Sequence, residues 1–122
     1  MGFEKAGVIK YLLIISALLF FTGCATARPW TIEEKVLLAA SCLAVAADMT
    51  TTLDGLNNGN WETNPMMGEY PSGSQVVLTM AATHAVFIIA AHYWSDFRTW
   101  ILGIKTGVNA GFAFHNMRTA KD

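Results

Sequence analysis

The chain has 122 residues, which is enough for one domain, and it is apolar and poor in charge. Hydrophobic residues make up 53% of the sequence and charged residues 14%, whereas ordinary soluble domains carry about 25% charged residues. The net charge of −1 and the absence of any Lys/Arg cluster exclude a nucleic-acid-binding protein of the usual kind. Two cysteines are too few for a disulfide framework. Because the charged residues stand between long apolar blocks, the sequence favours a membrane protein.

The first block is a short apolar run over residues 11–21, which follows two lysines and leads through Thr and Gly to Cys24. A basic start, an apolar stretch and a small-residue exit are typical of a bacterial export signal. Its end at Cys24 resembles the lipobox of bacterial lipoproteins, although Phe21 stands where a lipobox usually has Leu. The resemblance implies that residues 1–23 are removed and that the Cys24 thiol is acylated, with palmitate as a typical chain. The alternative is an uncleaved first membrane helix that contains a cysteine.

The next element is a helix that begins after a linker over residues 24–31. Thr31 and Glu34 have the spacing of a capping box, which predicts the start of a helix. We expect a first span over residues 33–54, whose apolar part ends where Asp48 begins a polar stretch. Its length suffices to cross a bilayer core of about 30 Å. Residues 55–73 follow as a loop rich in Gly, Asn and Pro, which mark turns.

Two further spans are predicted, over residues 75–94 and 98–117, before a polar tail at residues 118–122. The first of them contains no Asp, Glu, Lys or Arg and ends in an aromatic pair suited to a membrane interface. The second contains Lys105 and has to be shielded by its neighbours. The predicted fold is therefore all-α, a small transmembrane bundle of three helices with its domain over residues 32–117. A soluble three-helix bundle is disfavoured because the middle helix lacks a polar stripe.

The polar residues after the first span follow an ordered string. Asp48, Thr51 and Thr52 share one helical face because they are spaced i, i+3 and i+4. The string continues to Pro65 as Asp-x-x-Thr-Thr-(six residues)-Gly-x-x-Glu-x-Asn-Pro. It resembles the signature of a family of small, uncharacterised bacterial and archaeal membrane proteins, classed as a domain of unknown function.

This resemblance covers about residues 36–117 of the chain. It implies a compact bundle of three or four helices with a late Asn, here Asn109 or, less well placed, Asn116. It brings no established activity. The lipobox in front of the bundle is a departure from the family's usual pattern, and it puts a shared cellular role in doubt.

Asp48 is the leading candidate site residue, because an ionisable group inside a membrane is costly unless it is paired, hydrated or neutralised. Its expected partners are Lys105 in the third span and His84 in the second. The candidate polar cluster consists of Asp48, Thr51, Thr52, Glu62, Asn64, His84, Lys105 and Asn109. These residues either cap and lock the helices, handle an ion or polar ligand, or catalyse a reaction. The first use is favoured, because the sequence has no nucleophile motif or phosphate-binding loop, and we expect no enzyme activity.

No metal site or cofactor is predicted. His84 and His92 are eight residues apart, which is about 12 Å along a helix, and no Cys-x-x-Cys or His-x-x-x-His spacing occurs.

Gly103, Gly107 and Gly111 recur every four residues, the small-xxx-small pattern with which membrane helices approach closely. Packing of this stripe inside the bundle is favoured over dimerisation. The expected contacts are Ala81, Ala82 and Ala85.

The functional prediction is a small, non-enzymatic envelope lipoprotein that acts by interaction or membrane packing. Its expected partners are membrane lipids and an envelope protein or a second copy. One alternative is an ion- or polar-ligand-binding or transport module built on Asp48, Glu62, His84 and Lys105. Another is an envelope effector of the phage or defence type.

The inner membrane is the favoured location, because three apolar spans bury far more apolar surface than one acyl anchor. Ala25 after Cys24, by contrast, resembles lipoproteins sent to the outer membrane. The topology stays open. With Cys24 outside, the loop over residues 55–73 and the tail lie in the cytoplasm, where the basic tail fits the positive-inside rule and the acidic loop does not.

Overall fold

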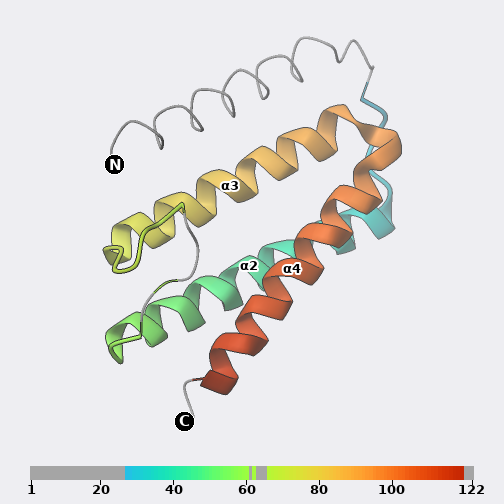
Figure 1. Cartoon of the computed structure of the whole chain (residues 1–122). Helices are drawn as coiled ribbons and strands as arrows, with labels where there is room; N and C mark the ends of the chain where they lie inside the picture. The colour runs from blue at the N-terminus through green and yellow to red at the C-terminus, as the bar shows by residue number, and fades with distance from the viewer. Residues whose placement is uncertain (1–26, 61, 63–65, 120–122) are drawn as a thin grey trace.

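In the part of the chain that the structure describes, three long helices make up the fold (Figure 1). The structure is a computed structural model that describes residues 27–60, 62 and 66–119. Helix α2 spans Ile32–Asn57, α3 spans Gly73–Tyr93 and α4 spans Arg98–Thr119, and a 3-10 turn, η1 (Ser95–Phe97), joins α3 to α4. The all-α bundle of three helices predicted from the sequence is confirmed. The predicted signal segment over residues 1–23, Cys24 and Asn64 lie outside the described residues.

The helix starts are set by short polar side chains. The Glu34 backbone N–H donates to Thr31 Oγ1 at 3.2 Å, and the Thr31 N–H donates to Glu34 Oε2 at 3.0 Å, so the predicted capping box is present. Ser72 and Gln75 form a second capping box at the start of α3. After α2, Gly59 has a φ of 85°, a conformation that glycine adopts without strain, and it turns the chain into the loop.

Helices α2 and α4 form the main interface of the bundle. Three polar pairs join them along their length: Glu34–Arg98, Asp48–Asn109 and Thr52–Asn116. The pairs follow the same order along both helices, so α2 and α4 run in the same direction. Helix α3, which separates them in the sequence, runs in the opposite direction. Figure 1 shows α4 crossing α2, with α3 alongside.

The burial pattern of the bundle is inverted relative to a water-soluble protein. Among the described residues, the buried side chains that are polar or charged outnumber the hydrophobic ones: Glu34, Ser41, Asp48, Thr52, His84, Ser95, Arg98, Lys105 and Asn109. Many large hydrophobic side chains, by contrast, lie on the outside, including Leu43 at 72% exposure, Leu78 at 69% and Trp100 at 71%.

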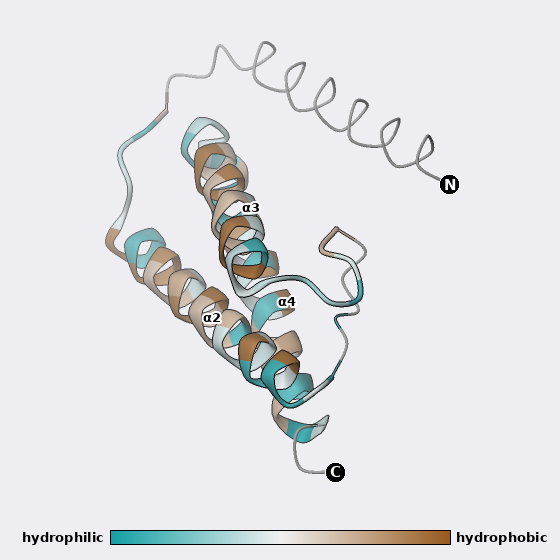
Figure 2. Cartoon of the chain, turned by 90° about the vertical axis from the view of Figure 1, so that its left-hand side faces the viewer, coloured by the Kyte–Doolittle hydropathy of each residue, from teal (hydrophilic) through white to brown (hydrophobic). Residues whose placement is uncertain are grey.

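Helices α2 and α3 are long and apolar enough to cross a membrane. Figure 2 shows hydrophobic residues along both of them and hydrophilic residues at the two ends of α2. Helix α4 has 22 residues, which is also long enough, but Lys105, Asn109 and Asn116 make it less apolar. That α4 is a third span therefore stays a prediction.

Candidate functional site

Polar side chains gather in two regions of the α2–α4 interface. The first, which we call the N-terminal clamp, consists of Arg28, Trp30, Glu34 and Arg98 at the start of both helices. The second, the Asp48 cluster, lies further along and consists of Asp48, Thr51, Thr52, Asn109 and Asn116.

The N-terminal clamp is built around Arg98, which has no exposed surface. Its Nε donates to the Ala91 carbonyl at 2.8 Å, its Nη1 donates to Glu34 Oε2 at 2.8 Å, and its Nη2 donates to the Arg28 carbonyl at 3.1 Å. The Trp30 ring stacks on the guanidinium, with 4.2 Å between the Arg98 carbon Cζ and the ring centroid. Every nitrogen of this buried cation thus has a partner, which is the condition for burying a charge at low cost.

Arg28 completes the N-terminal clamp from the linker. Its Nη1 donates to Glu34 Oε2 at 3.0 Å, so the buried Glu34 carboxylate is shared by two guanidinium groups. The hydrogen bond to Glu34 raises the pKa of the half-exposed Arg28 side chain above its ordinary value. The sequence indicated only the capping role of Glu34 and placed Arg98 at the start of the third predicted span. Nothing in the sequence except their opposite charges indicated that Glu34 and Arg98 form an ion pair.

In the Asp48 cluster, the direct partner of Asp48 is Asn109. The Asn109 amide Nδ2 donates to Asp48 Oδ2 at 2.6 Å, and both side chains are buried, with 3% and 5% of their surfaces exposed. Among the described residues Asp48 therefore forms no ion pair with Lys105 and no hydrogen bond with His84, although Lys105 is close enough to interact with it electrostatically. The Lys105 ammonium lies 5.1 Å from the centroid of the Phe87 ring, and no ion pair of Lys105 occurs within the described part of the chain.

Thr51 and Thr52 extend the Asp48 cluster toward the end of α2. The Asn116 amide Nδ2 lies 3.2 Å from the hydroxyl oxygens of both threonines. Thr51 also donates to the Ala47 carbonyl at 2.9 Å. Asn109 and Asn116, the two candidates for the late asparagine of the family resemblance, both contact α2.

His84 lies apart from the Asp48 cluster, between α3 and α2. Its Nε2 is 3.4 Å from the Cys42 sulfur, and its Nδ1 has no hydrogen-bond partner in the described structure. Cys42 is exposed on α2 and contacts this histidine. Among the described residues, no three His, Cys, Asp or Glu side chains lie close enough to hold a metal ion.

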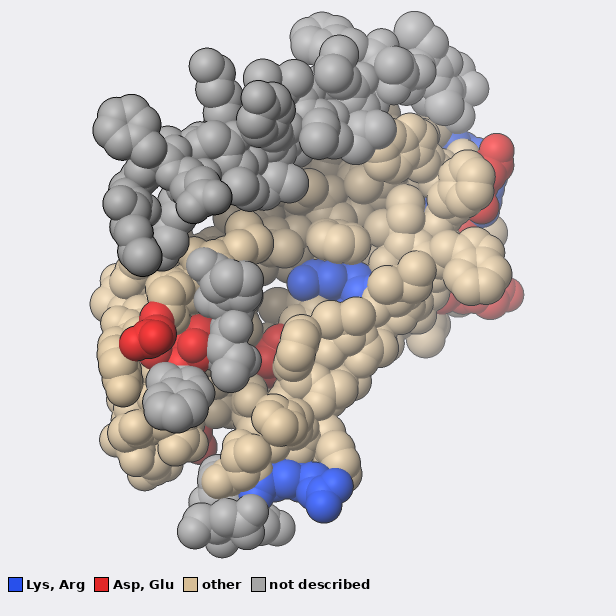
Figure 3. All heavy atoms as spheres, viewed as in Figure 1, with Lys and Arg blue, Asp and Glu red and all other residues tan. Residues whose placement is uncertain are grey.

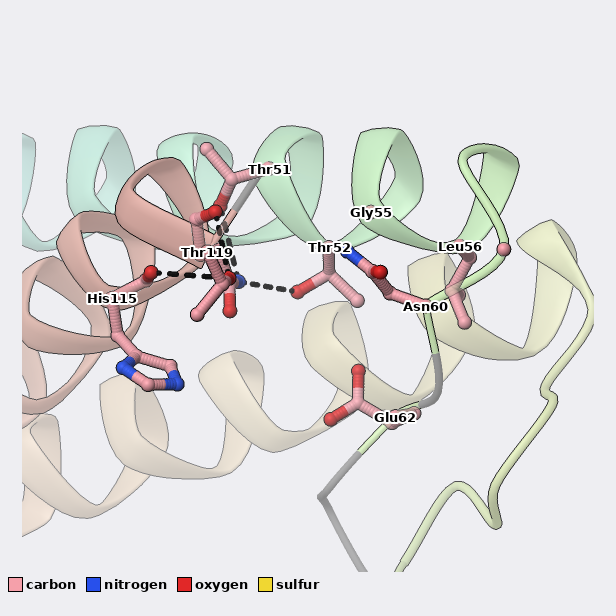
Figure 4. Close-up of a pocket in the computed structure, with 10 residues that line it drawn as sticks. Thr51, Thr52, Gly55, Leu56, Asn60, Glu62, His115 and Thr119 are labelled. Carbon is pink, nitrogen blue, oxygen red and sulfur yellow. Dashed lines mark hydrogen bonds between the residues drawn. The ribbon is translucent and has the colours of Figure 1, made fainter. Parts of the chain in front are cut away.

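The Asp48 cluster borders an open cavity of about 720 Å³ between the helices and the loop. Asp48, Thr52 and Glu62 supply its polar lining together with His115 and Asn116. A second cavity of about 340 Å³ shares four of these residues and opens toward the end of α4. In Figure 4 the Glu62 carboxylate points toward Thr52 and His115. The two spaces together form one partly polar hollow, which we call the Asp48 cavity.

Gly107 and Gly111 of α4 border this cavity, and none of the three glycines of the stripe packs closely inside the bundle. A Cβ built on Gly103, Gly107 or Gly111 meets no described atom within 4 Å, and Gly107 and Gly111 line the larger space. The predicted packing of the stripe against Ala81, Ala82 and Ala85 is therefore wrong, and these three alanines are exposed. The physical reason is the orientation of α4, which turns its Leu102, Lys105 and Asn109 face to its neighbours.

Comparison with known proteins adds no relative to this description. No protein-family model matches the chain, and no curated protein or solved structure is significantly similar to it. The lipobox and the resemblance to a domain of unknown function thus stay predictions from the sequence, and function has to be argued from the geometry.

Proposed function

We propose that this protein is an integral membrane protein of the bacterial envelope, in which all three helices cross the bilayer and polar contacts hold them together from the inside. The observation that carries the proposal is the inverted burial pattern. In lipid, apolar side chains gain nothing by turning inward, whereas polar and charged ones are stabilised when they pair inside the bundle. The pairs Glu34–Arg98 and Asp48–Asn109 fit this arrangement.

Helix α4 fits a third span despite its composition. Its ionisable and amide side chains Lys105 and Asn109 are buried, while Trp100, Ile104 and Phe112 on its outer side are more than half exposed. An apolar outer surface of this kind is suited to contact with the hydrocarbon chains of a bilayer. Figure 3 agrees with this: most of the face shown is uncharged, and charged atoms lie at its edges or in a hollow in its middle.

The N-terminal clamp lies where a membrane interface is expected. The aromatic side chains of Trp30, Tyr93 and Trp94 occur at this end of the bundle, next to the half-exposed Arg28. Trp and Tyr at such positions anchor membrane proteins at the level of the lipid head groups. In this proposal the clamp lies at one membrane surface, and the loop before α3 lies at the other.

The proposal includes the lipid anchor at Cys24 and the inner membrane as its location. Helix α2 begins at Ile32, so only a short linker separates Cys24 from the N-terminal clamp. An acyl chain at Cys24 would then enter the leaflet on the clamp side. The three spans alone bury enough apolar surface to keep the protein in the membrane without the acyl anchor. The proposed role is non-enzymatic, through contacts made within the membrane.

Carbonate extraction of isolated membranes tests this proposal. We expect the wild type and Cys24→Ala both to stay in the membrane pellet, because the helices and not the acyl chain hold the protein. A peripheral lipoprotein would give the opposite pattern, with Cys24→Ala released into the supernatant. That release would show that the three helices form a water-soluble bundle.

A further inference from the structure

We propose that the contact between Trp30 and His92 is an acid-sensitive latch, which holds the linker before α2 against the end of α3. Protonation of His92 opens the latch and releases residues 27–31 of the linker from the bundle. This inference assigns a regulatory device to the N-terminal clamp and goes beyond the proposed function. It depends neither on the lipid anchor nor on the number of helices that cross the membrane.

The contact fixes the protonation state of His92. The Trp30 indole Nε1 donates to His92 Nδ1 at 3.3 Å. An indole nitrogen can only donate, so Nδ1 has to be the accepting nitrogen of a neutral imidazole, and the ring proton is on Nε2. Protonation would place a second N–H at Nδ1, and two donors would then face each other. His92 is exposed, so that protons from the solvent reach it.

The cations around His92 oppose a further positive charge. Arg98 Nη2 donates to the His92 carbonyl at 3.3 Å, and the Trp30 ring stacks on the same guanidinium. Arg28 Nη2 donates to the Ser95 carbonyl at 3.1 Å, at the start of the turn that follows α3. Protonated His92 is therefore the third cation at this corner of the bundle, and like charges at short range repel one another.

The acidic groups of the N-terminal clamp do not offset that charge. The Glu34 carboxylate already accepts from both arginines, and Asp96 interacts electrostatically with Arg28. Within the described residues, neither carboxylate forms an ion pair with His92. Tyr93, the remaining titratable neighbour, contacts His92 edge-on with 5.2 Å between the ring centroids, and it contributes a neutral phenol.

Opening of the latch affects the linker and leaves the helix pairing in place. Without the hydrogen bond to His92, the Trp30 ring loses its only polar contact and is free to leave the guanidinium of Arg98. The Glu34–Arg98 pair between α2 and α4 does not involve either ring. Acid therefore shifts the linker between a held and a released position while the bundle stays folded.

A nitroxide label on Ala27→Cys tests the proposal by electron paramagnetic resonance. The full chain carries Cys24→Ala and Cys42→Ala and is placed in nanodiscs of phosphatidylcholine. Between pH 7.5 and pH 5.0 we expect the ratio of mobile to immobile label to rise about fivefold, the factor that corresponds to one hydrogen bond. The same label on Asp54→Cys, an exposed position of α2 outside the clamp, should not change.

Three variants of the labelled chain separate the latch from other effects of acid. His92→Asn keeps an acceptor near the position of Nδ1 but does not titrate, so its linker should stay immobile at both pH values. Trp30→Phe keeps a stacking ring without the N–H, so its linker should be mobile already at pH 7.5 and respond little to acid. His115→Asn removes another exposed histidine, outside the clamp, and should respond as the wild type does.

Four results would overturn the proposal. The first is an unchanged mobility of the Ala27→Cys label in the otherwise unaltered linker at pH 5.0. The second is a full response to acid in His92→Asn or in Trp30→Phe, and the third is loss of the response in His115→Asn. The fourth is an equal rise in mobility at Asp54→Cys, which would show that acid loosens the whole bundle and not the linker.

Discussion

The N-terminal clamp and the Asp48 cluster both bring a carboxylate of α2 against a nitrogen-bearing side chain of α4, but they differ in how completely their polar atoms are satisfied. In the clamp, each nitrogen of Arg98 donates a hydrogen bond and the Glu34 carboxylate accepts from two guanidinium groups. In the Asp48 cluster, Asn109 Oδ1 has no hydrogen-bond partner within the described structure, and an open cavity lies beside Asp48. A fully hydrogen-bonded polar cluster contributes more stability than one that leaves a buried polar atom unpaired.

The largest effect is expected from breaking the N-terminal clamp. Arg98→Ala removes a buried cation and leaves the Glu34 carboxylate and four backbone carbonyls with fewer donors. We expect the free energy of unfolding in detergent to fall by about 3 kcal/mol or more, with lower accumulation in cells. Arg98→Lys should recover only part of it, because an ammonium cannot reproduce the fork of donors.

Arg118→Ala is the matched control for the N-terminal clamp. Arg118 is an exposed arginine of the same helix, whose guanidinium carbon lies 5.8 Å from the centroid of the Phe114 ring. Its removal should change stability little, since exposed charge contacts are worth less than about 1 kcal/mol. A stability loss as large as that of Arg98→Ala would show that the clamp has no special role.

The next effect concerns the pair Asp48–Asn109. Asp48→Ala and Asn109→Ala should each destabilise the protein by about 1–3 kcal/mol, because each leaves a buried polar partner unpaired. In a double-mutant cycle the two changes should be far from additive. The cycle of Asp48→Ala with Lys105→Ala should show smaller coupling. A reversed order of the two couplings would restore the Asp48–Lys105 pairing suggested by the sequence.

A smaller effect is expected at the open end of the same interface. Asn116→Ala removes the amide that contacts the hydroxyls of Thr51 and Thr52, which are less deeply buried than Asp48. We expect a loss of about 1 kcal/mol, the usual net value of a hydrogen bond. Chemical denaturation in detergent measures it. A cost equal to that of Arg98→Ala would contradict the distinction between the two ends.

The smallest effect on stability is expected from Cys24→Ala. Cys24 precedes the N-terminal clamp in the sequence and lies outside the described residues. The substitution should remove the acyl mass from the mature protein and leave the unfolding transition unchanged. Mass spectrometry of the wild type decides the lipidation itself. An intact Met1, or a mature chain that begins at Ala25, would exclude acylation at Cys24.

The sequence was sufficient for features that depend on near neighbours. The capping box of Thr31 and Glu34 closes within four residues, and the long apolar runs set the three helices irrespective of how they pack. The helix boundaries were missed by no more than three residues, as at the end of α2, where the predicted limit of 54 became Asn57. Such local signals do not depend on how the helices pack against one another.

Contacts between helices could not be predicted in the same way. Asp48 was singled out correctly as a buried carboxylate, but its partner depends on the rotation and register of α4, which place Asn109 against it instead of Lys105. The same rotation turns the glycine stripe toward the cavity. Arg98 was missed because it stands two residues after Asp96 at a helix start, where a solvated residue is the usual expectation. Only the parallel course of α2 and α4 brings Glu34 to it.

Labelling of single cysteines from the two sides of the membrane tests the central claim, that α4 as well as α2 and α3 crosses the bilayer. In a Cys24→Ala, Cys42→Ala background, a membrane-impermeant thiol reagent is applied to intact and to lysed spheroplasts carrying Glu69→Cys, Asp96→Cys or Thr119→Cys. These three positions are exposed and lie respectively in the loop before α3, in η1 and at the end of α4. Our account predicts that Asp96→Cys reacts from one side, and that Glu69→Cys and Thr119→Cys both react from the other. Reaction of Asp96→Cys and Thr119→Cys from the same side would show that α4 does not cross, and would contradict the account.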